Sequence, residues 1–353
     1  MKALILSGGK GTRLRPITHS MAKQLVPVAN KPTLFYGLEA MRDAGVREVG
    51  IIVGDTADEI KRAVDDGSQW GLCVTYIHQP QPLGLAHAVL TAEPYLQGSP
   101  FVMYLGDNIV KHGVTEFVQE FERARPNALI LLAKVPNPQD FGVAELSGDQ
   151  VVRLIEKPAQ PKSDLALVGV YLFDSTIFQA ARAISPSARG ELEITDAIQW
   201  LIDNGKQVNA KQVTGWWKDT GSLEALLEAN RLTLEDAEPL NEGQVVNSQL
   251  SGRVIVERGA QITDCVIRGP VCIGADSVLQ GAFVGPFTAI GRRCRLINAE
   301  IEFSIVLDDS HLENLSARIE NSLIGQGVQV KGGSRPSRTL QLMLGDHSAI
   351  TFP

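Results

Sequence analysis

A short apolar run followed by a glycine-rich turn opens the chain: Leu4-Ile5-Leu6-Ser7-Gly8-Gly9-Lys10-Gly11-Thr12-Arg13-Leu14. This pattern is typical of a buried strand that ends in a loop. Glycine has no Cβ, so the backbone N–H groups of such a loop can converge on an anion. The loop does not match the phosphate loop GxxxxGK(S/T). Nor does it match a dinucleotide-binding loop, because no acidic residue precedes Glu39.

The distribution of charge also points to an anionic ligand near the N-terminus. Six cationic residues precede Glu39, although the whole chain carries a net charge of −7. These residues are Lys2, Lys10, Arg13, Arg15, Lys23 and Lys31. A basic segment on an acidic protein favours an anion at that segment. The overall negative charge argues against nucleic acid as a partner.

Composition is that of a globular protein of about two domains. The 353 residues are 44% hydrophobic and 21% charged, and ~150 residues per domain is the usual size. No apolar run reaches the ~18 residues of a membrane span, and the N-terminus does not resemble a secretory signal. We therefore expect a cytoplasmic protein with no membrane partner. The four cysteines form no CxxC pair, which favours buried thiols.

Residues 1 to about 240 alternate apolar runs with amphipathic stretches. The expected strands are Ala3–Leu6, Val49–Val53, Val74–Ile77, Phe101–Tyr104, Ala128–Ala133 and Val168–Phe173. The expected helices are Thr33–Ala44, Ala57–Asp66, Leu85–Leu96, Thr115–Ala124 and Asp196–Asn204. A hairpin is expected where Val143–Leu146 and Val151–Ile155 flank Ser147-Gly148-Asp149. This alternation predicts an α/β domain with a mainly parallel sheet covered by helices.

The pattern changes after the acidic stretch Glu235–Pro239, which we interpret as a linker. From about residue 250, aliphatic residues recur every six positions and are often followed by a small residue. They are Ile255, Ile267, Ile273 and Leu279 and then, one residue out of phase, Val284, Ile290 and Leu296. A six-residue period predicts a parallel β-helix with three hexads per triangular coil. The predicted domains are residues 1–238 and 239–353, the second ending in a C-terminal tail.

A second string, Lys23-Gln24-Leu25-Val26-Pro27-Val28-Ala29-Asn30-Lys31-Pro32, follows the glycine-rich turn. The two strings together resemble the sugar nucleotidylyltransferases, and within them the glucose-1-phosphate thymidylyltransferases. The resemblance extends to about residue 235. Further matching segments are Gln79–Pro80, Leu83–Ala86, Leu105–Asn108, Phe141–Val143, Glu156–Pro158, Arg189–Asp196 and Trp217–Gly221. The resemblance implies a Rossmann-like nucleotidyltransferase domain followed, as in the long form of the family, by a left-handed parallel β-helix.

The resemblance implies transfer of a thymidylyl group from dTTP to glucose 1-phosphate, which gives dTDP-glucose and pyrophosphate. The attacking phosphate oxygen is already anionic at neutral pH, so positioning and electrostatic stabilisation should dominate over general base catalysis. Arg13 would contact the leaving pyrophosphate, and Lys23 the transferred phosphate. The implied nucleotide-binding residues are Gly8, Gly9, Gly11, Thr12, Gln24, Gln79 and Gly84. The implied sugar-phosphate-binding residues are Gly142, Glu156, Lys157, Val168 and Arg189.

Two aspartates are candidate ligands for Mg²⁺. Asp107 follows the apolar run Phe101–Leu105 after one glycine, so it should lie at the carboxyl end of a strand, where ligands bind in open α/β sheets. Asp219 precedes the Thr220-Gly221 turn. Mg²⁺ is a hard cation that prefers oxygen ligands, and the resemblance implies that both carboxylates bind it.

Several alternatives stay open at this point. The enzyme could prefer UTP or another sugar 1-phosphate, or it could be a non-catalytic homologue that binds nucleotide sugars. It could also be bifunctional, since β-helices of this type occur in acyltransferases that use a histidine base, and His311 lies in the repeat region. Phe141 stands where the family favours tyrosine, which affects sugar discrimination. The flat faces of a β-helix favour a homo-oligomer.

Overall fold

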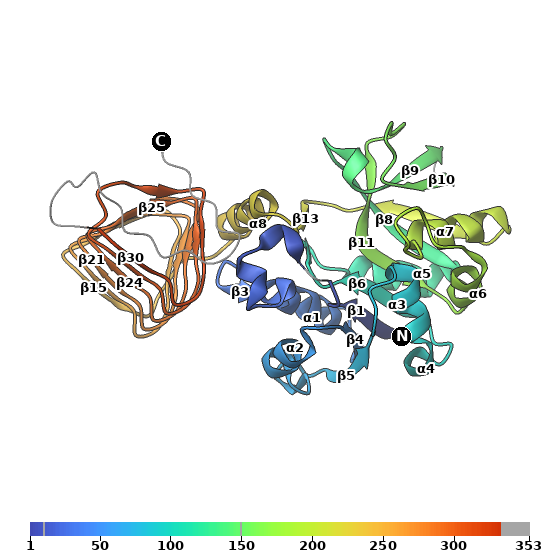
Figure 1. The fold of residues 1–353 in the computed structure, drawn as a ribbon, viewed down its shortest axis with the longest axis horizontal. Helices are drawn as coiled ribbons and strands as arrows, with labels where there is room; N and C mark the ends of the chain where they lie inside the picture. The colour runs from blue at the N-terminus through green and yellow to red at the C-terminus, as the bar shows by residue number, and fades with distance from the viewer. Residues whose placement is uncertain (10, 149, 333–353) are drawn as a thin grey trace. The chain divides into compact units, whose positions relative to one another are not determined.

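The first sheet is built around β1 (Lys2–Leu6), which pairs in parallel with β4 (Glu48–Val53) on one side and β6 (Phe101–Leu105) on the other. The computed structural model describes residues 1–9, 11–148 and 150–332. Beyond β6 the chain direction changes, since β11 (Leu165–Phe173) is antiparallel to β6. The order is β10 (Gln150–Glu156), β9 (Gly142–Ser147), β11, β6, β1, β4 and β5 (Cys73–His78), with β8 (Ala128–Lys134) and β12 (Val208–Gln212) joined through β11 (Figure 1).

Both faces of this sheet are covered by helices. Along β1, Ala3 and Ile5 point into one apolar cluster, and Leu4 and Leu6 into the other. This explains why the run is continuously apolar, because a strand buried on both faces has no polar side. One face packs against α1 (Thr33–Asp43), α2 (Ala57–Val64) and α5 (Thr115–Ala124). The other packs against α3 (Leu85–Thr91), α6 (Thr176–Ala183) and α7 (Ile194–Asp203). The predicted α/β class is confirmed.

Local differences from the prediction have simple causes. The helix expected at Leu85–Leu96 is two helices, α3 and α4 (Glu93–Leu96). Pro94 lies in the first turn of α4, where its missing N–H costs nothing, whereas inside one long helix it would break the hydrogen-bond ladder. The expected hairpin is the antiparallel pair β9–β10, and Asp149 of its turn lies outside the described residues. The short strands β7 (Asn108–Val110) and β13 (Trp217–Asp219) were not predicted.

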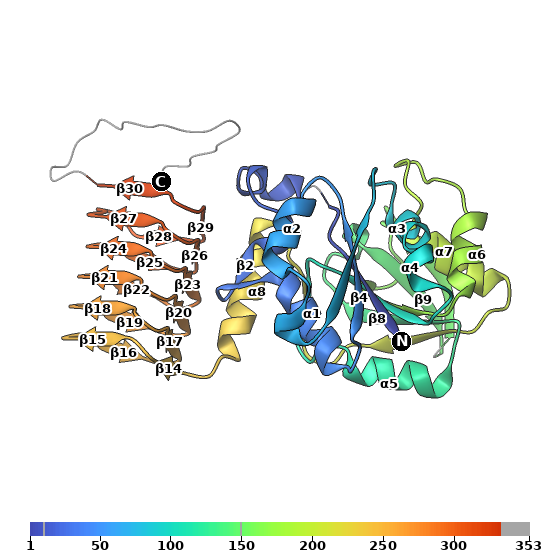
Figure 2. The same ribbon diagram turned by 90° about the horizontal axis from the view of Figure 1, so that it is seen from below.

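The second part of the chain is the left-handed parallel β-helix that the resemblance led us to expect. Three parallel sheets form its sides, and Figure 2 shows its coils stacked. The first sheet contains β14 (Leu240–Asn241), β17 (Val254–Val256), β20 (Val271–Ile273), β23 (Thr288–Ile290), β26 (Ile305–Val306) and β29 (Leu323–Ile324). The second contains β15 (Gln244–Val246), β18 (Gln261–Thr263), β21 (Val278–Gln280), β24 (Arg295–Ile297), β27 (His311–Glu313) and β30 (Gln329–Lys331). The third contains β16 (Gln249–Ser251), β19 (Val266–Arg268), β22 (Phe283–Val284), β25 (Glu300–Glu302) and β28 (Ile319–Glu320).

The register of these strands explains the slip in the six-residue period. Leu279 pairs with Leu296 in the second sheet, and Val284 pairs with Ile301 in the third. The step from Leu279 to Val284 is therefore one residue short of a hexad. Six of the seven predicted core aliphatics are fully buried. The exception is Ile255, which is half-buried because its neighbours Val254 and Val256 point inward instead.

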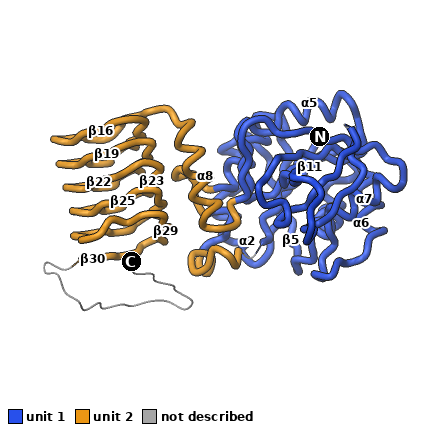
Figure 3. Tube along the Cα trace, turned by 90° about the horizontal axis from the view of Figure 1, so that it is seen from above, with its two compact units in different colours: residues 1–10, 21–25, 33–219 blue, residues 11–20, 26–32, 220–353 orange. Residues whose placement is uncertain are grey.

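The described residues divide into two compact units, coloured separately in Figure 3. The first takes the described residues of Met1–Lys10, Met21–Leu25 and Thr33–Asp219. The second takes Gly11–Ser20, Val26–Pro32 and the described residues from Thr220 onward, including α8 (Leu223–Glu235) and the β-helix. The predicted C-terminal tail lies outside the described residues from 333 onward. None of the helices in the described ranges has the length and apolar character needed to cross a membrane.

Candidate functional site

Two short strands bring the predicted metal-binding aspartates together. Asp107 directly precedes β7, and Asp219 ends β13. These strands pair antiparallel with Asp219 opposite Asn108, so the two carboxylates lie next to each other although 111 residues separate them in the sequence. Lys23 Nζ donates a hydrogen bond to Asp107 Oδ2 and lies 4.0 Å from Asp219 Oδ1. Both carboxylates therefore converge on one ammonium group.

Further hydrogen bonds fix the orientation of Asp107. Asn108 Nδ2 donates to Asp107 Oδ1 at 2.9 Å, and Trp217 Nε1 donates to Asn108 Oδ1 at 2.6 Å. Burial on its own would raise the pKa of the Asp107 carboxyl. The charge of Lys23 and the hydrogen bonds from Lys23 and Asn108 outweigh burial and hold that pKa below its usual range. Sequence reasoning missed the roles of Asn108 and Trp217, although both lie in segments that carry the family resemblance.

A pocket of about 210 Å³ collects most of the predicted nucleotide-binding residues. We call it the glycine pocket, because Gly8, Gly9 and Gly84 line it. Its other lining residues are Leu6, Gln24, Ile52, Gln79, Pro82, Leu85, Ala88, Leu105, Asp107 and Glu191. The pocket lies at the carboxyl ends of β1, β4, β5 and β6, where Leu6, Ile52, Gln79 and Leu105 stand. This is where open α/β sheets bind ligands.

The two glutamines of the glycine pocket are buried and suited to read a base. Gln24 is 3% exposed, and its Oε1 has no hydrogen-bond partner among the described residues. Gln79 is 7% exposed, and its Nε2 lies 2.8 Å from Nδ1 of His87. A glutamine amide offers both a donor and an acceptor to a pyrimidine edge. Because an unpaired buried amide oxygen is costly, Gln24 points to a ligand that supplies a donor.

Gly84 shapes the mouth of the same pocket. Its φ of +104° lies in the left-handed region, and a Cβ there would collide with the backbone carbonyl of Leu192. Backbone hydrogen bonds join the two segments, from Leu192 N to Leu83 O at 2.8 Å and from Ala86 N to Leu192 O at 3.0 Å. Only glycine allows this close approach. The pairing brings the loop after Arg189 to the pocket, where Glu191 lines the wall.

Arg189 and Glu156, predicted to contact the sugar phosphate, lie in one ion-pair network. Arg189 Nη2 donates to both carboxylate oxygens of Glu193, at 2.8 and 2.9 Å, and to Glu156 Oε1 at 3.3 Å. It also lies 3.5 Å from Glu191 Oε2, so the network adjoins the glycine pocket. Burial and the charge of Glu193 raise the pKa of the Glu156 carboxyl, against the opposing charges of Arg189 and Lys157. Sequence reasoning missed Glu193, which is 4% exposed.

Of the remaining predicted sugar-site residues, Gly142 and Lys157 lie beside Glu156, and Val168 lies in the core. A Cβ on Gly142 would lie 2.7 Å from Thr195 Cγ2 and 3.1 Å from Glu156 Oε2, so a larger residue there would displace these side chains. Lys157 N donates to the backbone carbonyl of Phe141 at 3.0 Å. The Phe141 ring packs edge-on against Trp217, with ring centroids 5.4 Å apart. Val168 is fully buried in β11.

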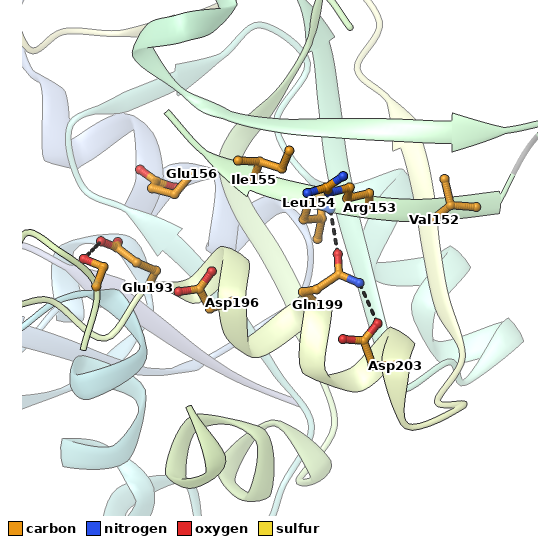
Figure 4. A pocket seen from close by; sticks show the side chains of 10 residues that line it. Val152, Arg153, Leu154, Ile155, Glu156, Glu193, Asp196, Gln199 and Asp203 are labelled. Carbon is orange, nitrogen blue, oxygen red and sulfur yellow. Dashed lines mark hydrogen bonds between the residues drawn. The ribbon is translucent and has the colours of Figure 1, made fainter. Parts of the chain in front are cut away.

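A second and larger pocket, of about 540 Å³, lies between β10 and α7. We call it the acidic pocket, because it is lined by four carboxylates and one cation (Figure 4). Its lining residues are Val152, Arg153, Leu154, Ile155, Glu156, Ser187, Glu193, Asp196, Gln199 and Asp203. Of the predicted site residues, only Glu156 lines it.

Gly11, Thr12 and Arg13 belong to the second compact unit. Gly11 has a φ of +62° and precedes η1 (Thr12–Leu14), a short 3₁₀ turn that carries Arg13. The Thr18 hydroxyl donates to the Gly11 carbonyl at 2.7 Å and closes the loop. The structure thus brings Gly8, Gly9, Gln24, Gln79, Gly84, Lys23, Asp107 and Asp219 together in the first unit, and places Arg13 on a closed turn of the second.

The donor set around Lys23 fits a Mg²⁺ ion that substrate phosphates help to hold. In the described ranges, no cluster of three or more His, Cys, Asp or Glu residues could enclose a metal. Mg²⁺ in nucleotide-binding sites is commonly held by one or two carboxylates together with phosphates and waters. The pair Asp107 and Asp219 supplies two such carboxylates, both beside the cation Lys23.

Comparisons with known proteins agree with this geometry. The model of the nucleotidyl transferase family matches residues 2–236. A glucose-1-phosphate thymidylyltransferase from Streptomyces griseus is 56% identical over 350 residues, which cover 99% of this chain and 98% of the relative. One from Streptomyces antibioticus is 55% identical over 353 residues, with 99% of both chains covered. The crystal structure of a putative glucose-1-phosphate thymidylyltransferase from Bacillus anthracis matches with a TM-score of 0.63 and 34% identity, covering 68% of this chain and 98% of that one.

Proposed function

The chain belongs to the nucleotidyl transferase family, and we propose that it transfers the thymidylyl group of dTTP to glucose 1-phosphate. The products are dTDP-glucose and pyrophosphate. The observation that carries this proposal is the convergence of three glycines, two buried glutamines and Asp107 on one pocket at the carboxyl edge of the sheet. Two full-length relatives named for this activity support the choice of substrates.

In the proposed reaction, Gly8 and Gly9 allow the triphosphate to approach the backbone, while Gln24 and Gln79 bind the base edge. Lys23 stabilises the negative charge of the α-phosphate that is transferred, and Arg13 stabilises the negative charge of the leaving pyrophosphate. No general base is required, because the attacking phosphate oxygen is already ionised. The contribution of these residues is therefore to hold two polyanions in line and to offset their repulsion.

We propose that Asp107 and Asp219 hold the Mg²⁺ ion. When bound, Mg²⁺ neutralises phosphate charge and organises the triphosphate. Lys23 lies beside both carboxylates, so its ammonium group would stabilise the charge of the same phosphates that the metal would neutralise. The low pKa of the Asp107 carboxyl keeps it ionised at neutral pH, as metal binding requires.

The sugar phosphate is proposed to bind around Glu156. The Glu156 carboxylate accepts hydrogen bonds from glucose hydroxyls, and Lys157 and Arg189 bind the phosphate. Gly142 and the backbone at Val168, whose side chain is buried in the core, form the wall. Arg189 is held by hydrogen bonds to Glu193. Phe141 supplies no hydroxyl to this wall, so sugar discrimination rests on Glu156 and the backbone.

We further propose that residues 1–238 carry the nucleotidyl transfer, that 239–353 form a non-catalytic domain, and that the protein acts as a homo-oligomer. His311 lies in a ladder between Arg295 and Gln329 on one side of the β-helix. That place is typical of a surface position in a coil.

The test is pyrophosphate release from the full-length protein over a panel of nucleotides and sugar phosphates. We expect dTTP with glucose 1-phosphate and Mg²⁺ to give the highest kcat/KM, and UTP or other sugars to give less. No release above background with any pair, or a clear preference for a purine nucleotide, would overturn the proposal. Adding acetyl-CoA to the same mixtures tests the bifunctional alternative, for which we expect no acetyl transfer.

A further inference from the structure

The string that follows Lys23 forms a hairpin whose tip has an unusual backbone. β2 (Pro27–Val28) pairs antiparallel with β3 (Lys31–Pro32), leaving Ala29 and Asn30 as the two turn residues. Their φ angles are +47° and +62°. Successive positive φ values are typical of a tight two-residue hairpin, where asparagine is favoured but alanine is not. Alanine at position 29 therefore does not by itself favour this turn.

Contacts from the β-helix and α8 hold this tip. Asn30 Nδ2 donates to the Ile290 carbonyl at 2.7 Å and lies 3.2 Å from Cys272 Sγ. Ala29 N donates to Oδ1 of Asn230, a fully buried residue of α8. The distance is 2.8 Å. Asn230 Nδ2 in turn donates to the Phe287 carbonyl at 2.9 Å. Each turn residue is therefore bonded, directly or through one side chain, to the coils between Cys272 and Ile290.

A second contact reaches η2, the turn that follows the one carrying Arg13. In η2 (Ile17–His19), the Ile17 side chain reaches the β-helix at Gly325, where a Cβ would lie only 3.2 Å from Ile17 Cδ1. Residues 11–20 and 26–32 thus cluster with the β-helix, while residues 21–25, which include Lys23, cluster with the first unit. The β-helix holds the chain on both sides of Lys23.

We propose that the β-helix serves nucleotidyl transfer by positioning the segment that carries Arg13 and Lys23, with Asn30 and Asn230 as its positioning residues. Neither residue touches substrate. They act by fixing the hairpin, and through it the two loops from which the catalytic cations extend. This role rests on the proposed function, since it assigns the β-helix a part in that same reaction rather than a separate activity.

Two full-length variants test it. Asn30→Gly keeps the positive φ but removes the amide that reaches Ile290. Asn230→Ala removes the link to Phe287. We expect hydrogen exchange of residues 11–20 and 26–32, followed by mass spectrometry, to quicken at least tenfold in both. We expect kcat/KM for dTTP to fall at least tenfold, while KM for glucose 1-phosphate changes less than twofold.

The matched control is Asn298→Gly. Asn298 lies in the β-helix and, like Asn30, has a positive φ, but its amide donates to Asn314 and not to the hairpin. Asn30→Gly with exchange and kinetics within twofold of this control would overturn the proposal. So would faster exchange with unchanged kcat/KM. If the wild-type protein showed no nucleotidyl transfer, the proposed function would be wrong. The catalytic part of this inference would then be wrong too, whatever hydrogen-exchange rates were measured.

Discussion

The glycine pocket and the acidic pocket lie in the same compact unit, but their chemistry is opposite. The acidic pocket is the larger, at about 540 Å³ against 210 Å³. Its carboxylates would repel a triphosphate. Their mutual repulsion is visible in two of them, because burial and the charge of Glu193 raise the pKa of both the Glu156 and the Asp196 carboxyl. The smaller pocket instead offers glycine backbone, two amides and a carboxylate paired with Lys23.

The comparison shows that the chemistry of the lining, rather than the volume, identifies the site for a polyanion. The difference arises in the fold. The glycine pocket lies at strand ends, where loops expose backbone groups. The acidic pocket lies beside β10 and α7, at a surface where charged side chains are commonly exposed to solvent. Substitutions in the first should therefore change catalysis, whereas substitutions in the second, at residues other than Glu156 and its partner Glu193, should change only stability.

The largest effect is expected for Asp107→Asn. Removing this charge weakens the metal and the bound triphosphate together, so turnover should fall roughly a thousandfold, as the several kcal/mol from a bound metal imply. Pyrophosphate release at saturating substrates measures it. The control is Asp43→Asn, since Asp43 is an exposed residue paired only with its neighbour Arg42 among the described residues. Near wild-type turnover of Asp107→Asn at limiting Mg²⁺ would remove Asp107 from the metal site.

A smaller and more selective effect is expected for Lys157→Ala. A lost charged hydrogen bond costs about 1.5–3 kcal/mol, so KM for glucose 1-phosphate should rise roughly 10- to 100-fold, with KM for dTTP nearly unchanged. Steady-state kinetics with each substrate varied in turn give both values. Lys162→Ala, an exposed lysine in the same loop, is the control. Equal losses for both substrates would contradict the assignment of Lys157 to the sugar phosphate.

Gln24→Leu and Gln199→Leu compare the two pockets directly. Gln24 Oε1 has no partner among the described residues, so its removal should leave the free energy of unfolding unchanged or raise it by about 1 kcal/mol. KM for dTTP should rise roughly five- to tenfold. Gln199 accepts from Leu154 N and donates to Asp203, both at 2.8 Å.

The expected result for Gln199→Leu is the reverse, with kinetics unchanged and a stability loss of about 1–3 kcal/mol from a backbone N–H left unpaired. Urea unfolding measures the stability of both variants, and steady-state kinetics with dTTP measure their KM. A destabilised Gln24→Leu with unaltered KM would show that Gln24 is a structural residue.

The smallest effect is expected for Asp203→Asn at the far end of the acidic pocket. Its side chain is exposed and accepts one hydrogen bond, from Gln199. Asparagine can accept the same hydrogen bond. We therefore expect kcat and both KM values to stay within twofold of wild type, and the free energy of unfolding to stay within ~0.5 kcal/mol. A drop in turnover would mean that the acidic pocket takes part in the reaction beyond Glu156.

Sequence patterns predicted the alternation of strands and helices from β1 to β11 and the six-residue repeat, because both depend on local periodicity, but they missed α6, β12 and α8. They did not predict β7 and β13, whose three residues each are too short for a period to appear. Yet that pairing is what places Asp219 beside Asp107. Likewise, Glu193 was missed because its importance comes from burial against Arg189, and Asn30 because its partners lie more than 240 residues away. Contacts between distant segments cannot be inferred from the order of residues in one chain.

The most direct test of the account is a crystal structure of the full-length protein with dTDP-glucose and Mg²⁺ bound. We predict the thymine ring in the glycine pocket, with hydrogen bonds to Gln24 and Gln79. We predict the glucose against Glu156 and the wall at Gly142, and the metal between Asp107 and Asp219. A nucleotide found instead in the acidic pocket between β10 and α7, with Gln24 and Gln79 untouched, would contradict the central assignment.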